Sequence, residues 1–201
     1  MFRKHGLENM YPLPHDTTEI CRLNDMHYMF WVHQGYRNII APIDPKPQQI
    51  LDLGTGSGRW VCEVAVEQPT ARVIGLDLVP VDPLEEVAYN CEFNVADFND
   101  GLVKLYGTCT MDLVHSRQSA LVILLTDRII MAGLSKFQWN SLMSEVYEIL
   151  RPGGWIQCCE FRGSHFFSES KRLPDDCALN EVLTNPLDTV CLTLTVLLIS
   201  G

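Results

Sequence analysis

The sequence predicts an α/β fold, a mostly parallel sheet with helices on both faces. Two observations support this prediction. Short apolar segments alternate with helical segments between residues 49 and 165, and the connections are short. The first apolar segment ends in alternating glycines, Gly54, Gly56 and Gly58, and a helix follows at once. Strands joined through crossover helices run parallel, because the helix returns the chain to the edge where the strand began.

Residues 1–48 are expected to form an N-terminal helical cap segment. Asp16 followed by Glu19 fits a capping box at the start of a helix. A helical spacing then places one set of largely apolar residues on a single face, and this helix is expected to stop before Pro42. The face consists of Ile20, Leu23, His27, Phe30, Trp31 and Gln34.

Residues 49–165 are expected to form the core domain. Apolar runs predict strands, and apolar residues at helical spacing predict the crossover helices. A helix over 135–150 is expected to end at Pro152-Gly153-Gly154, just before the fifth strand. The predicted strands are 50–53, 72–77, 89–95, 111–115 and 155–161, and the first crossover helix is 59–68.

The glycine loop indicates a nucleotide-type cofactor, because glycine lets a ligand press against bare main chain at a helix start. The spacing is G-x-G-x-G, whereas dinucleotide-binding loops have G-x-G-x-x-G. Asp52 precedes the loop, and a carboxylate there would repel a pyrophosphate. It could instead accept hydrogen bonds, through ordered water, from a cationic amino-acid ligand. The loop therefore favours S-adenosylmethionine, and a nicotinamide-dependent oxidoreductase is the disfavoured alternative.

A second acid supports a cofactor site. Asp77 ends the predicted strand 72–77, 19 positions after Gly58. A carboxylate at the tip of the second strand can hold both ribose hydroxyls, a role that both cofactor classes share. Leu78 is then expected to pack on the adenine.

These motifs resemble class I, Rossmann-like methyltransferases that use S-adenosylmethionine. Within that class they are most similar to the fungal group that includes the velvet-complex regulator of secondary metabolism. Three segments carry the resemblance. They are Tyr11-Pro12-Leu13-Pro14-His15-Asp16 with Arg22-Leu23, the loop 51–60, and the turn and strand 150–156.

The resemblance adds further site residues. Asp97 and Phe98 resemble the pair that meets the adenine amino group and ring, and Tyr11 is expected to reach the cofactor's carboxylate. His115 ends the fourth strand, where it is either a general base or a histidine bonded to backbone. No metal site is expected. The candidate cofactor-binding residues are Tyr11, Asp52, Gly54, Thr55, Gly56, Gly58, Asp77, Leu78, Asp97, Phe98 and His115, of which only His115 is a catalytic candidate.

The expected function is methyl transfer to a small-molecule or protein acceptor, in secondary metabolism or its regulation. The alternative is a catalytically inactive relative that binds the cofactor or a regulatory protein partner. His15 and Thr17, which depart from the group's usual amide and acidic residues, favour this alternative. The resemblance and the absence of a secretion signal lead us to expect a cytoplasmic or nuclear location.

The composition of the chain limits the kinds of binding partner and the compartment that we expect. The 201-residue chain has a net charge of −10 and no basic cluster, so direct nucleic-acid binding is not expected. The apolar stretch near the C-terminus is too short to span a bilayer as a helix. Eight cysteines without a C-x-x-C pair indicate buried thiols in a reducing compartment.

Residues 166–201 are expected to form a short C-terminal tail that is either truncated or atypical, so the C-terminal strands of the sheet could be incomplete. Members of this fold usually add two further strands after the fifth, one of them antiparallel. The β-branched and leucine-rich run 189–200 predicts one strand, or else a tail introduced by an incorrect gene model. The acceptor and the oligomeric state are not encoded in any motif found.

Overall fold

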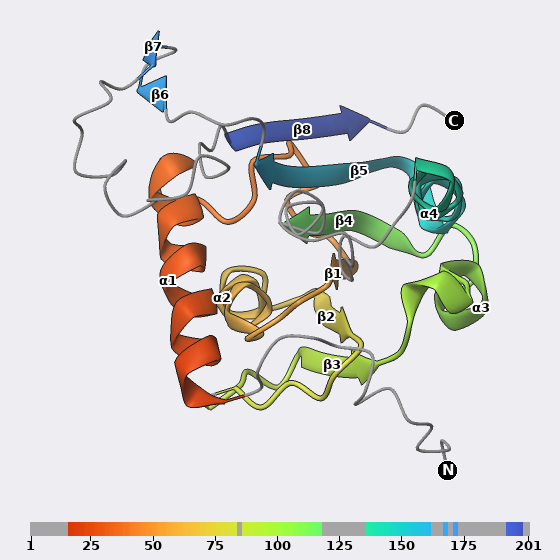
Figure 1. The fold of residues 1–201 in the computed structure, drawn as a ribbon. Helices are drawn as coiled ribbons and strands as arrows, with labels where there is room; N and C mark the ends of the chain where they lie inside the picture. Colours follow the sequence, from red (N-terminus) through yellow and green to blue (C-terminus); the bar gives the residue numbers. More distant parts are fainter. Residues whose placement is uncertain are drawn as a thin grey trace.

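The computed structural model describes residues 16–83, 86–117, 136–161, 167–168, 171–172 and 192–198. A six-stranded sheet in the order β3-β2-β1-β4-β5-β8 forms its centre (Figure 1). The first five strands run parallel and β8 runs antiparallel to β5, which confirms the predicted α/β class. The strands are β1 (Gln49–Leu53), β2 (Arg72–Asp77), β3 (Cys91–Val95), β4 (Met111–Arg117), β5 (Leu150–Phe161) and β8 (Leu192–Leu198), with β6 (Phe167–Ser168) and β7 (Lys171–Arg172) in a separate pair.

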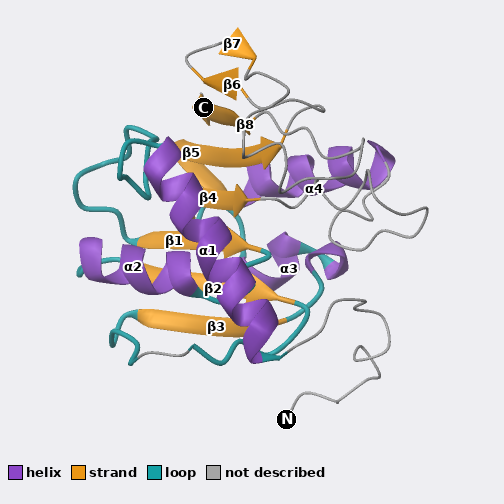
Figure 2. Ribbon diagram, turned by 60° about the vertical axis from the view of Figure 1, so that its left-hand side comes forward, coloured by secondary structure: helices purple, strands orange, loops and turns teal. Residues whose placement is uncertain are grey.

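Helices cover both faces of the sheet, as predicted. On one face lie α1 (Thr17–His33) and α2 (Arg59–Glu67); on the other lie α3 (Leu102–Tyr106) and α4 (Lys136–Ile149). Figure 2 shows α1 crossing the strands on the side of α2. The sequence did not indicate α3, because five residues are too few for a helical period. Within the described ranges, no helix has the length and apolarity needed to cross a membrane.

Two apolar clusters form the core, one on each side of the sheet. Strand β1 contributes side chains to both clusters. Ile50 packs on the side of α2, whereas Leu51 and Leu53 pack on the side of α3 and α4. All three side chains are at most 1% exposed. Successive residues of a strand face opposite sides, so a strand buried on both faces is apolar throughout.

Helix α1 begins where the sequence predicted. The Asp16 carboxylate accepts a hydrogen bond from the Glu19 backbone N–H at 2.9 Å. The Glu19 carboxylate binds the Arg22 guanidinium, so it does not complete the expected capping box. The predicted apolar face is confirmed, with His27 and Phe30 buried against the domain.

The start of β5 corrects the sequence prediction. The strand begins at Leu150, whereas a break at Pro152-Gly153-Gly154 was expected. The extra residues form an irregularity in the ladder with β4, where Gly153 adopts a φ of +81°. Arg151 fixes this segment by donating to the Asp112 carboxylate at 2.9 Å. In addition, β3 begins at Cys91 and not at residue 89.

The C-terminal run contributes the edge strand β8, which pairs with β5 from Trp155↔Leu198 to Phe161↔Leu192. The strand predicted within 189–200 is therefore confirmed. Cys158 and Cys159 on β5 are buried, whereas Cys21 and Cys109 are exposed, and none of the six described cysteines forms a disulfide. One strand thus covers the edge of β5 that would otherwise be open.

Candidate cofactor-binding site

The glycine loop between β1 and α2 has the backbone that only glycine adopts easily. Gly54, Gly56 and Gly58 have φ values of +71°, +58° and +77°. A Cβ atom on Gly58 would lie 2.8 Å from Phe93 and from Val81. Gly58 is therefore required by packing within the protein as well as by its turn.

Asp77 holds this loop against the end of β2. Its Oδ2 accepts a hydrogen bond from the Gly56 N–H at 2.8 Å, while Gly54 and Thr55 donate to the Leu76 carbonyl. Asp77 is only 3% exposed, and burial raises the pKa of its carboxyl group. Sequence reasoning assigned Asp77 to a ribose and missed that it also fixes the loop.

Asp52 and His115 form a buried pair on neighbouring strands. They are partners in the β1–β4 register, and 2.7 Å separates His115 Nδ1 from Asp52 Oδ1. The His115 ring stacks on Trp60 at 3.8 Å with an interplanar angle of 5°. Of the two expected roles for His115, the simple backbone-bonded one is wrong, because its partner is a carboxylate.

The protonation of this pair follows from its surroundings. Burial lowers the pKa of His115, and the nearby Asp52 charge opposes this shift. A neutral His115 donates its Nδ1–H to Asp52, so Nε2 is left as an acceptor. Among the described residues, this buried Nε2 has no hydrogen-bond partner. It can therefore accept a proton or a hydrogen bond from a ligand.

A pocket lies where α1 crosses the glycine loop and the ends of β1 and β4. It brings together five of the predicted residues, namely Asp52, Gly54, Thr55, Gly56 and His115. Residues that were not predicted as site residues complete the lining. They are Leu23, Met26 and His27 from α1, Ser57 from the loop, Trp60 from α2 and Arg117 from β4. The described residues contain no cluster of three or more His, Cys, Asp or Glu that could hold a metal.

The remaining predicted residues lie outside this pocket. Asp77 is the last residue of β2, Leu78 follows it, and Asp97 lies just after β3, where the Ala96 N–H donates to the Asp77 carbonyl. Phe98 packs into the apolar core and is 5% exposed, so its expected contact with adenine has no support in this structure. Tyr11 lies outside the described residues.

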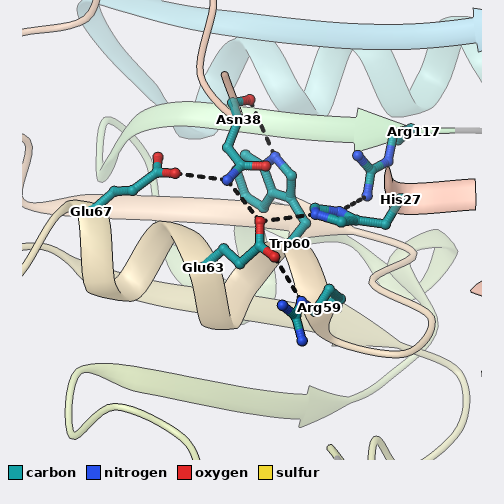
Figure 3. Close-up of polar contacts among 7 residues, drawn as sticks. All are labelled: His27, Asn38, Arg59, Trp60, Glu63, Glu67 and Arg117. Atoms are coloured by element: carbon teal, nitrogen blue, oxygen red, sulfur yellow. Dashed lines mark hydrogen bonds and ion pairs between the residues drawn. The ribbon is translucent and has the colours of Figure 1, made fainter. Parts of the chain in front are cut away.

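A polar network beside the pocket joins α1 to α2 and β4 (Figure 3). The Glu63 carboxylate accepts hydrogen bonds from His27 Nε2 at 2.9 Å, Arg59 Nε at 2.6 Å and Asn38 Nδ2 at 3.0 Å. Arg117 donates to His27 Nδ1 at 2.7 Å. Although burial raises the pKa of Glu63, these hydrogen bonds lower it to about 2. Arg59 and Glu63 are i,i+4 partners on α2, but the other partners are far apart in the chain, so no local pattern revealed the whole network.

The strand order and the glycine loop define a Rossmann-like cofactor-binding domain, since ligands of such sheets bind at the carboxyl ends of the strands. The profile described as "Methyltransferase domain" matches residues 45–193, which is 149 of 201 residues. The chain therefore belongs to the methyltransferase family.

Two fungal proteins that match this chain agree with this assignment. The methyltransferase PytC of Aspergillus terreus is 34% identical over 176 residues, covering 87% of this chain and 49% of PytC. The protein-methionine methyltransferase LaeA of Emericella nidulans is 34% identical over 157 residues, covering 78% of this chain and 38% of LaeA. The chain thus spans half or less of the length of these relatives. A crystal structure of a SAM-dependent methyltransferase from Archaeoglobus fulgidus superposes with a TM-score of 0.48 at 14% identity, covering 81% of this chain and 66% of that one.

Proposed function

We propose that this chain binds S-adenosylmethionine in the pocket beneath α1 and transfers its methyl group to a small-molecule or protein acceptor. The observation that supports this best is the joining of the glycine loop with the buried Asp52–His115 pair in one pocket. The name "Secondary metabolism regulator laeA", which several relatives carry, supports a role in secondary metabolism or its regulation.

Methyl transfer from a sulfonium is an in-line displacement. A lone pair of the acceptor forms a bond to the methyl carbon, the sulfur–carbon bond breaks, and its electron pair returns to sulfur. The domain then chiefly aligns the two reactants and excludes water. An acceptor with an N–H or O–H also loses a proton, and His115 Nε2 is the group we propose to take it. If so, His115→Gln retains donor binding and loses turnover.

Calorimetric titration of the purified chain with S-adenosylmethionine and, separately, NAD tests the donor assignment. We expect micromolar binding of S-adenosylmethionine only. Asp77→Asn should weaken binding, because it removes the charge proposed to hold the ribose but keeps an acceptor for the loop. Asp44→Asn is the matched control, since Asp44 is exposed and, among the described residues, accepts only a local hydrogen bond from the Lys46 N–H. Binding of NAD would overturn the assignment.

A non-catalytic regulator is the second candidate, since several relatives carry the name "Secondary metabolism regulator laeA". We propose that such a protein would bind the cofactor and act through a regulatory protein partner. Formation of S-adenosylhomocysteine in the presence of fungal metabolite and protein extracts separates the two candidates. Donor binding without any product would favour the regulator.

A further inference from the structure

Arg117 is a charged residue of the pocket to which the proposed reaction assigns no role. It is the last residue of β4, and among the described lining residues it is the only lysine or arginine. Its guanidinium lies 5.1 Å from the centre of the Phe30 ring on α1. Arg117 is partly buried; burial lowers the pKa of its guanidinium group, and the Asp52 charge opposes this shift.

The hydrogen bond of Arg117 goes to a neutral group. A guanidinium only donates, so His27 Nδ1 must accept this bond. His27 is then neutral and donates its Nε2–H to the Glu63 carboxylate. Within the described ranges, no carboxylate lies at ion-pair distance from Arg117. His27 thus holds the Arg117 guanidinium in place, and none of the carboxylates that the structure describes contacts it directly.

A partly buried guanidinium group with donors that no described residue occupies favours an anionic ligand. Guanidinium groups bind carboxylates through two parallel hydrogen bonds, which supply geometric specificity as well as energy. The methionyl end of S-adenosylmethionine carries one carboxylate and one ammonium group. The pocket offers charges of both signs, Arg117 for the carboxylate and Asp52 for the ammonium. The pocket and the zwitterion are therefore complementary.

We propose that Arg117 binds the α-carboxylate of S-adenosylmethionine, and that His27 is the positioning residue that orients the guanidinium. This inference rests on the proposed function, because it assigns a role within the same donor site. The inference also assigns a role to α1. This helix covers the pocket and carries His27, which orients the Arg117 guanidinium.

Decarboxylated S-adenosylmethionine tests the assignment directly, because it lacks only the group that Arg117 is proposed to bind. Arg117→Gln should weaken S-adenosylmethionine binding by about tenfold or more, as expected for a charge-assisted hydrogen bond. The same change should leave the affinity for the decarboxylated compound nearly unchanged. Calorimetry with both compounds gives the comparison.

His27 is tested through its effect on Arg117. His27→Leu removes the acceptor and should weaken S-adenosylmethionine binding in the wild-type background but not in Arg117→Gln. His27→Gln retains an acceptor oxygen and should recover part of the affinity. If His27 has only a structural role, His27→Leu should weaken the binding of both compounds equally, with or without Arg117→Gln. That result would overturn the positioning role.

Control variants separate this inference from the proposed function. Arg151→Gln removes an arginine that pairs with Asp112 outside the pocket, so donor affinity should not change. If the wild type binds neither compound, the proposed function fails. Two results would overturn only the carboxylate assignment, provided that the wild type binds S-adenosylmethionine. Either Arg117→Gln binds S-adenosylmethionine as tightly as the wild type, or its affinities for both compounds fall by the same factor. Should Arg117→Gln not fold, Arg117→Lys replaces it, with the same selective loss expected at smaller size.

Discussion

At the scale of single residues, Gly58 satisfies two requirements that can be separated. Its φ of +77° disfavours any side chain, and a Cβ would also overlap Phe93 and Val81 at 2.8 Å. Gly58→Ala should therefore lower the free energy of unfolding by about 2–4 kcal/mol, the sum of backbone strain and overpacking. Urea unfolding measures the loss.

Gly35 provides the matched control for this prediction. Its φ is +68°, but no atom lies within 4 Å of a Cβ built there. Gly35→Ala therefore adds backbone strain without overlap and should cost about 1 kcal/mol. Equal losses in the two variants would show that packing against Phe93 and Val81 is not what requires Gly58.

The Asp52–His115 bond allows a second residue-scale prediction. Asp52→Ala leaves the buried Nδ1–H of His115 without an acceptor and should lower the free energy of unfolding by about 2–3 kcal/mol. Asp52→Asn keeps an amide oxygen as acceptor and should cost about 1 kcal/mol. Urea unfolding of both variants gives the comparison, and equal small losses would mean that the bond adds little stability.

At the scale of elements, the contact of α1 with α2 depends on the charge of Glu63. Its folded-state pKa of about 2 lies below the ordinary value of 4.5, so the unfolded chain binds its proton first as the pH falls. The stability contributed by Glu63 is therefore fully present above about pH 4.5 and is lost as the pH falls toward 2.

Comparison with Glu63→Gln tests this pH dependence. The difference in unfolding free energy between wild type and variant should be constant from pH 5 to 7 and shrink below about pH 4.5. Glu19→Gln is the control, since Glu19 forms an ion pair with Arg22 within α1. A difference that does not change with pH would contradict the assigned role of the charge.

Elements differed in how well the sequence predicted them. Strands β1 and β2 and helix α2 lay within a residue of expectation, because apolar runs bounded by glycine or proline are strong local signals. The start of β5 was misplaced, since Gly153 normally indicates a break. In the structure, Gly153 adopts a left-handed backbone conformation and so accommodates an irregularity in the pairing of β4 with β5.

At the scale of the whole molecule, β8 protects the edge of the sheet. It pairs along β5 from Trp155 to Phe161. A chain ending at residue 191 would expose this row of backbone donors and acceptors, and we expect it to be less stable and to self-associate. Size-exclusion chromatography and urea unfolding check this. A stable monomer would show that β8 is dispensable.

The sequence by itself determined the parallel sheet, the glycine loop and the acids at the strand ends, because each rests on local backbone geometry and on the order of elements. The sequence also indicated Asp52 and His115 as candidate site residues, but it did not predict the hydrogen bond between them. Only the tertiary structure decided that pairing and the approach of His27 to Arg117, which lie 90 positions apart. Such contacts depend on how α1 and β4 pack together, and side-chain packing across distant elements leaves no periodic trace in the chain.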